Sequence, residues 1–170
     1  MSSGEKYYGK YRGVVVSTVD PQQMGRIIAQ VPDLGPVPLT YAMPSFPVTG
    51  KQMGFWSLPQ IGTGVWVEFE QGDRDHPIWT GCWYGSAADV PALALATQAP
   101  LSSVFMQTAA QVTFQLSDLP GPAGGILLKT ATGAMIMVND VGITISNGKG
   151  AMIVMAGPTV TINNGALVIT

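Results

Sequence analysis

Charged residues are scarce in this sequence of 170 residues. Asp, Glu, Lys and Arg together make up 11%, whereas about a quarter is usual in soluble domains. Hydrophobic residues make up 46%, so the chain can bury a core and is not an intrinsically disordered segment. The net charge of −2 and the pI near 5.1 give no general attraction to nucleic acid. With so few charges, we expect much of the surface to be interface rather than solvated.

Cysteine and histidine occur once each. Cys82 has no partner for an intrachain disulfide. His76 lies beside Asp73 and Asp75, but no second histidine or cysteine ligand is near, and Asp-rich segments usually shape turns. We therefore predict no metal site and no cofactor.

Two residue pairs could indicate catalysis, but each has a simpler explanation. Cys82 with His76 as its base could be a nucleophile, yet a small buried hydrophobic residue in the closing strand is the better interpretation. Glu68 and Glu70 could be a hydrolytic carboxylate pair, yet they fit as solvent-facing charges on a strand. The three arginines of the chain are too few for an electrostatic nucleic-acid groove. We predict neither enzyme activity nor nucleic-acid binding.

Long helical apolar runs are also missing. Residues 90–117 and 150–170 contain no charged residue, but proline and polar side chains interrupt both runs. A membrane-spanning helix needs about 20 predominantly apolar residues. The first ten residues contain no apolar signal core, so we expect no membrane anchor.

What the sequence does contain is a repeat. Residues 125–138 recur as residues 142–155, and a shortened third copy covers 159–170. Residues 106–118 align with 128–140, once five extra residues are assigned to a Pro/Gly loop at 119–123. A fixed period is typical of repeat architectures, and each copy has the pattern of a strand, a glycine-containing turn and a strand. We predict about eight short strands across residues 104–170.

One chain cannot cover this β-stack. Residues 135–138 and 152–155 are apolar on both faces, and such strands need cover on both sides. We therefore expect several copies of the chain to wrap around a common axis. The residues predicted to face that axis are Val141, Ile143, Ile145, Val160 and Ile162.

The first half has no helical period and predicts a small antiparallel barrel over residues 11–85. Its prolines should restrict residues 40–47 to an edge strand or an irregular stretch. Residues 1–10 are expected to form an arm, and residues 86–103 a linker, either extended or with a short helical turn. The other strands are expected at 11–19, 26–31, 65–70 and 78–84.

The order of these motifs resembles a known family. Residues 11–85 resemble the oligonucleotide/oligosaccharide-binding-like (OB) barrel of contractile-tail spikes, a group that includes the phage baseplate assembly protein V family and VgrG proteins. The most specific match is the alternating strand 65–70, the Gly-Asp-x-x-x-Pro turn at 72–77 and the strand that ends at Gly81. Residues 104–170 resemble the trimeric β-helix that follows the barrel. The resemblance implies an all-β fold, with an N-terminal OB-like barrel followed by an intertwined trimeric β-helix.

The resemblance also implies a function and partners. Such spikes are structural homotrimers on a hub at the end of the tube, and they help to pierce a target envelope when the sheath contracts. Only ten residues precede the barrel here, so we expect the hub to be a separate protein. We expect assembly in the cytoplasm of the producing cell, as part of a phage tail, an extracellular injection particle or a type VI-like system, and arrival outside or in the target cell on release or contraction. An alternative is a stand-alone OB-type ligand-binding module with a trimerising β-stalk.

The end of the chain suggests a further partner. Some phage spikes end in a His-x-His apex that holds iron, and this sequence has none. Three ends formed by Leu167, Val168, Ile169 and Thr170 would leave an apolar face with open strand edges. The resemblance implies that a PAAR-type tip protein docks there.

Overall fold

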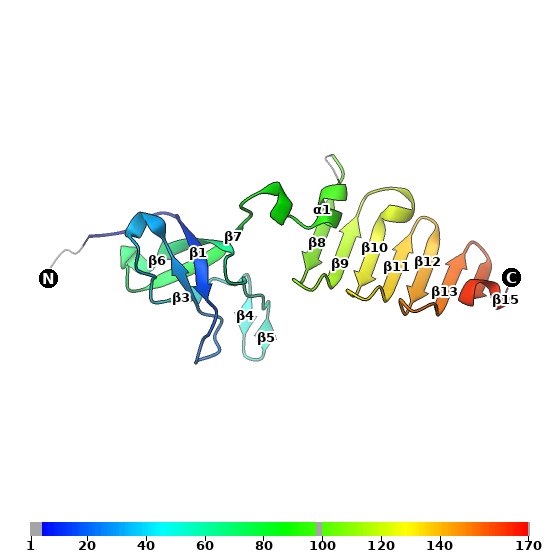
Figure 1. The fold of residues 1–170 in the computed structure, drawn as a ribbon, viewed down its shortest axis with the longest axis horizontal. Coiled ribbons are helices and arrows are strands. Elements are labelled where there is room, and N and C mark those ends of the chain that lie inside the picture. Colours follow the sequence, from blue (N-terminus) through cyan, green and yellow to red (C-terminus); the bar gives the residue numbers. More distant parts are fainter. Residues whose placement is uncertain (1–4, 98–99, 170) are drawn as a thin grey trace. The chain divides into compact units, whose positions relative to one another are not determined.

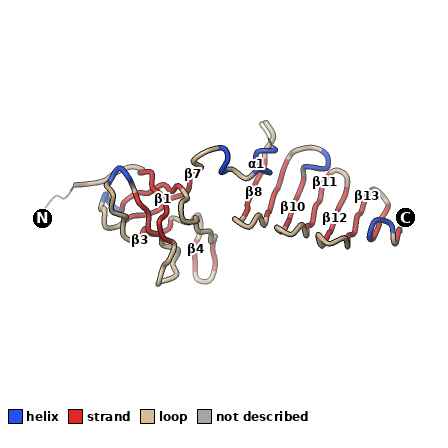
Figure 2. The backbone as a smooth tube through the Cα atoms, in the orientation of Figure 1, coloured by secondary structure: helices blue, strands red, loops and turns tan. Residues whose placement is uncertain are grey.

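The computed structural model describes residues 5–97 and 100–169 (Figure 1). The chain divides into two compact units, the first ending at Asp89 and the second beginning at Val90. Figure 2 shows that strands dominate both units, which confirms the predicted all-β class. The α-helix α1 (Ala92–Ala96) lies in the predicted linker. No helix in the described residues is long and apolar enough to cross a membrane.

The first unit is a closed five-stranded barrel. Its strand order is β1-β2-β3-β7-β6. Short 3-10 turns follow β2, β6 and β7, as η1 (Pro32–Leu34), η2 (Glu70–Gly72) and η3 (Ala87–Asp89). The barrel strands are β1 (Tyr11–Ser17), β2 (Ile27–Gln30), β3 (Tyr41–Pro44), β6 (Gly64–Phe69) and β7 (Pro77–Trp83).

Alternation along the strands builds the barrel core. In β6, Val65, Val67 and Phe69 are buried, while the residues between them are only partly covered, as the sequence pattern predicted. Trp79 is buried on β7, and its indole Nε1 donates a hydrogen bond to the Gly25 carbonyl at 3.1 Å. The other buried hydrophobic residues are Val15, Ile27, Ala29, Val31, Leu39 and Ala42.

The strand β3 differs from its prediction. It was expected to be an edge strand or irregular, but it closes the barrel by pairing antiparallel with β2 and parallel with β7. This is possible because β3 has four residues and Pro44 is the last of them, so its missing N–H falls at the end of the ladder. The barrel therefore has one parallel contact among antiparallel ones.

A carboxylate fixes the turn between β1 and β2. Asp20 accepts hydrogen bonds from the backbone N–H groups of Gln22 (3.0 Å), Met24 (2.8 Å) and Arg26 (3.2 Å). It also accepts two from the Arg26 guanidinium, at 2.6 and 2.9 Å. The guanidinium lies 4.5 Å from the centre of the Tyr41 ring. The Arg26 hydrogen bond is the main reason why the pKa of Asp20 lies far below its usual range.

A hairpin and the N-terminal arm are attached to the barrel. A hairpin of β4 (Thr49–Gly50) and β5 (Met53–Gly54) projects from it, and the sequence analysis did not predict this hairpin. In the N-terminal arm, the backbone N–H of Tyr7 donates to the Gly72 carbonyl at 3.0 Å. The Tyr7 ring packs on Phe69, with centroids 6.0 Å apart, so the described part of the arm is attached to the barrel.

The second unit is one antiparallel sheet in which each strand pairs with the next along the chain. The eight strands are as many as predicted, and the sequence repeat carries β10 onto β12 and β11 onto β13. The turn η4 (Gly121–Ala123) occupies the predicted loop, and η5 (Asn163–Gly165) precedes the last strand. The strands are β8 (Ser103–Gln107), β9 (Thr113–Ser117), β10 (Gly125–Lys129), β11 (Met135–Asn139), β12 (Gly142–Ser146), β13 (Met152–Ala156), β14 (Thr159–Ile162) and β15 (Leu167–Ile169).

Glycine is required where the repeat begins each copy. Gly125 has φ +81° and Gly142 has φ +150°, conformations that residues with a side chain rarely adopt. A Cβ at Gly125 would collide with the Val138 carbonyl oxygen, and one at Gly142 with the Met155 carbonyl oxygen. The same backbone approach thus recurs one repeat later, which explains why these two glycines occupy equivalent positions.

Candidate trimer interface

Strand register places two columns of side chains on one face of the sheet. Residues directly opposite on antiparallel strands project to the same side, as do Val138 and Ile143, or Ile136 and Ile145. Following this rule through all seven ladders gives the face that we call the apolar face. Its first column is Val104, Leu116, Ile126, Val138, Ile143, Met155, Val160 and Ile169, and its second is Met106, Phe114, Leu128, Ile136, Ile145, Ile153, Ile162 and Leu167.

Every side chain of the apolar face is hydrophobic, and in the single chain most are open to solvent. Their exposed fractions reach 55% at Val104 and at Ile169, the two ends of the sheet, and are 37% at Ile153. The face thus exposes apolar surface on the order of 1,000 Å², more than the roughly 300–600 Å² of the largest patch on a typical monomer. This face is therefore built for contact with another surface.

The chain itself covers part of the opposite face. There Thr113 and Gln115 of β9 are 4% and 5% exposed. Ala92 and Leu93 of α1 lie across a small hollow from Thr113, and the Thr97 and Ser117 hydroxyl oxygens are 2.9 Å apart. The segment with α1 thus covers the opposite face around β9, whereas the apolar face is open along the sheet. Farther along, the opposite face also carries apolar side chains, Met137 and Val154 among them, and these are only half-buried.

The structure brings four of the five predicted core residues onto this face. Ile143 and Ile145 lie on β12, and Val160 and Ile162 lie on β14, one in each column. Val141 does not join them, since it sits in the turn before β12 and is 58% exposed. The role of these residues as the core of an assembly stays a prediction.

The sequence analysis missed the remaining members of the apolar face. The sequence does contain a signal for them, a two-residue alternation. Val104 and Met106, and likewise Ile126 and Leu128, alternate with residues of the opposite face. What it could not supply was the register that joins these pairs into two continuous columns.

The last strand carries the predicted docking residues. β15 pairs with β14 on one side, and no strand among the described residues pairs with its other edge. Leu167 and Ile169 belong to the apolar face, Val168 points to the opposite one, and all three are about half exposed. Thr170, the fourth predicted residue, lies outside the described residues.

Cys82 and His76, the residues considered as a nucleophile and its base, lie apart on the barrel. His76 Nδ1 lies 3.3 Å from Asp73 Oδ2, and the pKa of Asp73 is lowered, chiefly by the Asp75 N–H that it accepts. Cys82 is near the far end of β7, about 15–20 Å along the strand from His76, and it is exposed, so the prediction that it is buried is wrong. Partial desolvation raises the pKa of its thiol. In the part of the chain that the structure describes, no three His, Cys, Asp or Glu side chains are arranged to hold a metal.

Glu68 and Glu70, considered above as a carboxylate pair, have different surroundings. Glu68 Oε1 accepts from the Lys10 ammonium at 2.6 Å, on the outside of β6. Glu70 begins the turn η2, where its carbonyl accepts from the Asp73 N–H at 2.9 Å. This arrangement fits solvent-facing charges.

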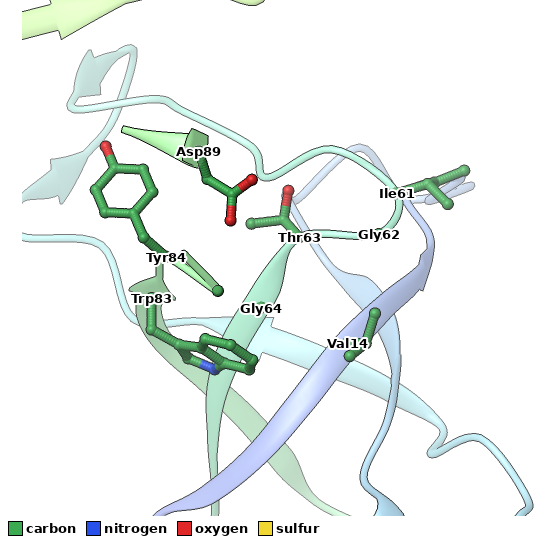
Figure 3. Close-up of a pocket in the computed structure, with 9 residues that line it drawn as sticks. Val14, Ile61, Gly62, Thr63, Gly64, Trp83, Tyr84 and Asp89 are labelled. Atoms are coloured by element: carbon green, nitrogen blue, oxygen red, sulfur yellow. The ribbon is translucent and has the colours of Figure 1, made fainter. Parts of the chain in front are cut away.

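A hollow of about 440 Å³ opens on the barrel wall, and Figure 3 shows Trp83, Tyr84, Asp89 and Thr63 around it. The Trp83 ring also packs against the Arg12 guanidinium, 5.1 Å from its centroid. The Asp89 carboxylate accepts from the backbone N–H of Ser86 at 2.9 Å. Asp89 thus stabilises the turn in the segment that leaves the barrel.

Comparison with known families matches both units. Residues 11–84 match the type VI secretion system/phage-baseplate injector OB domain. Residues 103–168 match the phage baseplate V C-terminal trimerisation domain. The chain belongs to the type VI secretion and phage baseplate spike family. No individual curated protein matches it.

Membership confirms the resemblance and gives the apolar face its context. The trimerisation match begins at β8 and ends within β15, so it covers the strands that carry the two apolar columns. The family is a structural one, and the chain has a structural role in a baseplate spike.

Proposed function

We propose that three copies of this chain pack their apolar faces around one axis and form the central spike of a contractile injection system. The observation that carries the proposal is the continuous apolar face, within a domain that matches a trimerisation family. Burying about 1,000 Å² per chain at about 25 cal/mol per Å² gives roughly 25 kcal/mol per chain before entropic costs. A contact of this size supports an obligate homotrimer.

The strand pairing constrains how the trimer forms. Each chain already pairs all eight strands of its own sheet, so the three sheets can meet face to face like the sides of a prism. The opposite faces, with α1, then point outward. Twisting of the three sheets about the axis would give the intertwined β-helix that the family resemblance implies.

The proposed work of the spike is mechanical. It sits on a separate hub protein at the tube end, and sheath contraction drives it through a target envelope. A stack held by interchain burial has to lose its contacts together, so unfolding is slow and the spike withstands force. The particle assembles in the cytoplasm of the producing cell and acts after release or contraction, and the spike itself has no catalytic activity.

Sedimentation equilibrium of the purified full chain tests the proposal. We expect a mass three times that of the 17.8 kDa chain, independent of dilution over the micromolar range. A stable monomer would overturn the spike proposal, and it would equally contradict the alternative, a ligand-binding module with a trimerising β-stalk. Imaging of the native particle with the chain at the tube end would place it in the assembly.

The proposal extends to a PAAR-type tip that docks on β15. The open edge of β15 offers main-chain hydrogen bonds, and Leu167, Val168 and Ile169 offer apolar contact. Deleting residues 166–170 should leave the trimer intact but abolish capture of the tip protein in a pull-down, with the full chain as control. Capture by a truncated trimer would disprove the docking site.

A further inference from the structure

A second uncharged surface lies on the barrel. Beside the β4–β5 hairpin is a hollow of about 810 Å³, and none of the residues that line it is charged. Met53 is 63% exposed and Trp56 is 60% exposed. Its larger lining residues are Met24, Met43, Phe46, Met53, Phe55 and Trp56.

One wall of this hollow is rigid. The Phe46 ring lies between Trp56 and Trp79, with centroids 5.5 Å from each, and Trp79 is fixed by its hydrogen bond to the Gly25 carbonyl. The Asp20 network holds the turn that carries Met24. The three methionines are flexible and adapt to a partner's shape. A fixed aromatic wall with adaptable apolar neighbours is suited to docking a protein surface.

Chain connectivity favours another copy of this protein as the occupant. Only residues 84–91 separate β7 from α1, and α1 lies against its own sheet. Eight residues span at most about 29 Å, close to the diameter of a barrel of this size, for which the radius of gyration is about 11–12 Å. A trimeric sheet therefore holds three barrels within reach, at an effective concentration of millimolar or higher.

At that concentration a weak contact is sufficient. An uncharged apolar hollow offers no ion pair to select a foreign partner. Any surface that fits it well removes apolar area from water, which is favourable. In a three-fold ring each copy presents the hollow to one neighbour and a different surface to the other. We propose that in the trimer the hollow beside the β4–β5 hairpin is buried against the barrel of a neighbouring copy. This inference rests on the proposed trimer.

Cysteine labelling of the full chain, purified without other baseplate proteins, tests the inference. In a Cys82→Ser background, Met53→Cys places a thiol in the hollow, and Asp75→Cys places one on an exposed turn of the same barrel. We expect a maleimide to react at least tenfold more slowly with the Met53→Cys trimer than with the Asp75→Cys trimer. Adding Ile143→Asp, which removes assembly, should bring the two rates within about twofold.

Each other result counts against the inference. Equal rates in a sample that sediments as a trimer would show the hollow open and available to a different protein. Slow labelling of the Met53→Cys variant that persists in the Ile143→Asp monomer would place the protection within one chain. A chain that sediments as a monomer from the start would overturn the proposed trimer, and this inference with it.

Discussion

In the barrel, ten hydrophobic residues between Val15 and Trp79 are buried within a single chain. In the described part of the sheet no hydrophobic side chain is buried, and the two buried side chains there, Thr113 and Gln115, are polar. The barrel is closed, so it encloses a core and has no open edge. The sheet is a single layer, so its apolar face needs a partner to be buried.

This difference separates two kinds of stability. The barrel core forms by intramolecular folding, so the core itself needs no second chain. The sheet gains its core only by association, so its stability rises with concentration. All four tryptophans belong to the barrel unit, from Trp56 to Trp83. Tryptophan fluorescence therefore follows the barrel and, through Trp56, any contact that buries the hollow beside the β4–β5 hairpin, while sedimentation reports on association of the sheet.

The largest effect is expected for a charge on the apolar face. Ile143→Asp should abolish the trimer, because three carboxylates would be buried without partners at a cost of several kcal/mol each. Thr144→Asp is the matched control, since the side chain at this neighbouring position points to the opposite face. Sedimentation should show a monomer for the first variant and a trimer for the second. If both variants behaved alike, the assigned register or the buried face would be wrong.

A smaller effect is expected where the repeat requires glycine. Gly142→Ala should cost on the order of 3–5 kcal/mol per chain, because the added Cβ meets the Met155 carbonyl oxygen. Gly150→Ala is the control: its φ is +103°, but the space around it is open, so it should cost only about 1–2 kcal/mol. Chemical unfolding of the trimer measures both. Equal losses would mean that backbone conformation, not the close approach, sets the requirement.

The two regions also differed in how far their sequences predicted them. The repeat made the strands of the sheet easy to predict, because equivalent segments of successive copies are expected to adopt the same structure. The strands β12 and β13 repeat β10 and β11. The alternation of apolar and polar residues correctly assigned the side chains of Ile143 and Thr144 to opposite faces of the sheet. The full apolar face could be traced only once the register of all seven strand pairs was known. That register is set by contacts between neighbouring strands, and no local sequence pattern reveals it.

The barrel was harder because its closure depends on distant contacts. The prolines of residues 40–47 argued against a central strand, yet Pro44 sits where its missing N–H is harmless. The Asp-Pro pair at residues 20–21 and Gly25 are turn signals that the sequence displays. The five hydrogen bonds of Asp20 and the stacking of Arg26 on Tyr41 follow only from the folded turn. Local turn chemistry is readable in a sequence, whereas the partners of a side chain often are not.

The Asp20 network gives a prediction for the barrel alone. Asp20→Asn should lower the barrel's Tm, followed by tryptophan fluorescence, by on the order of 10 °C, while the trimer persists in sedimentation. Asp33→Asn, at an exposed 3-10 turn, is the control and should change little. A variant that lost the trimer would show that the two units are not independent.

The same carboxylate sets a pH dependence. The folded state lowers the pKa of Asp20, so its stabilisation is complete above the unfolded value, near 4, and is lost as pH falls below it. The barrel's Tm should therefore drop between about pH 4 and pH 2, and the Asp20→Asn variant should show a flatter profile. Identical profiles would assign the acid sensitivity to other groups.

The smallest effect is expected on the barrel surface. Lys10 and Glu68 form a short ion pair, but their side chains are 53% and 39% exposed, and water and salt screen such pairs. Glu68→Gln should change barrel stability by at most about 0.5 kcal/mol, measured by urea unfolding with tryptophan fluorescence, and should leave the trimer unchanged. The Gln side chain can still accept from Lys10, so even the local geometry is kept. A loss several times larger would mean that this exposed charge supports the fold, and that the barrel depends on more than its enclosed core.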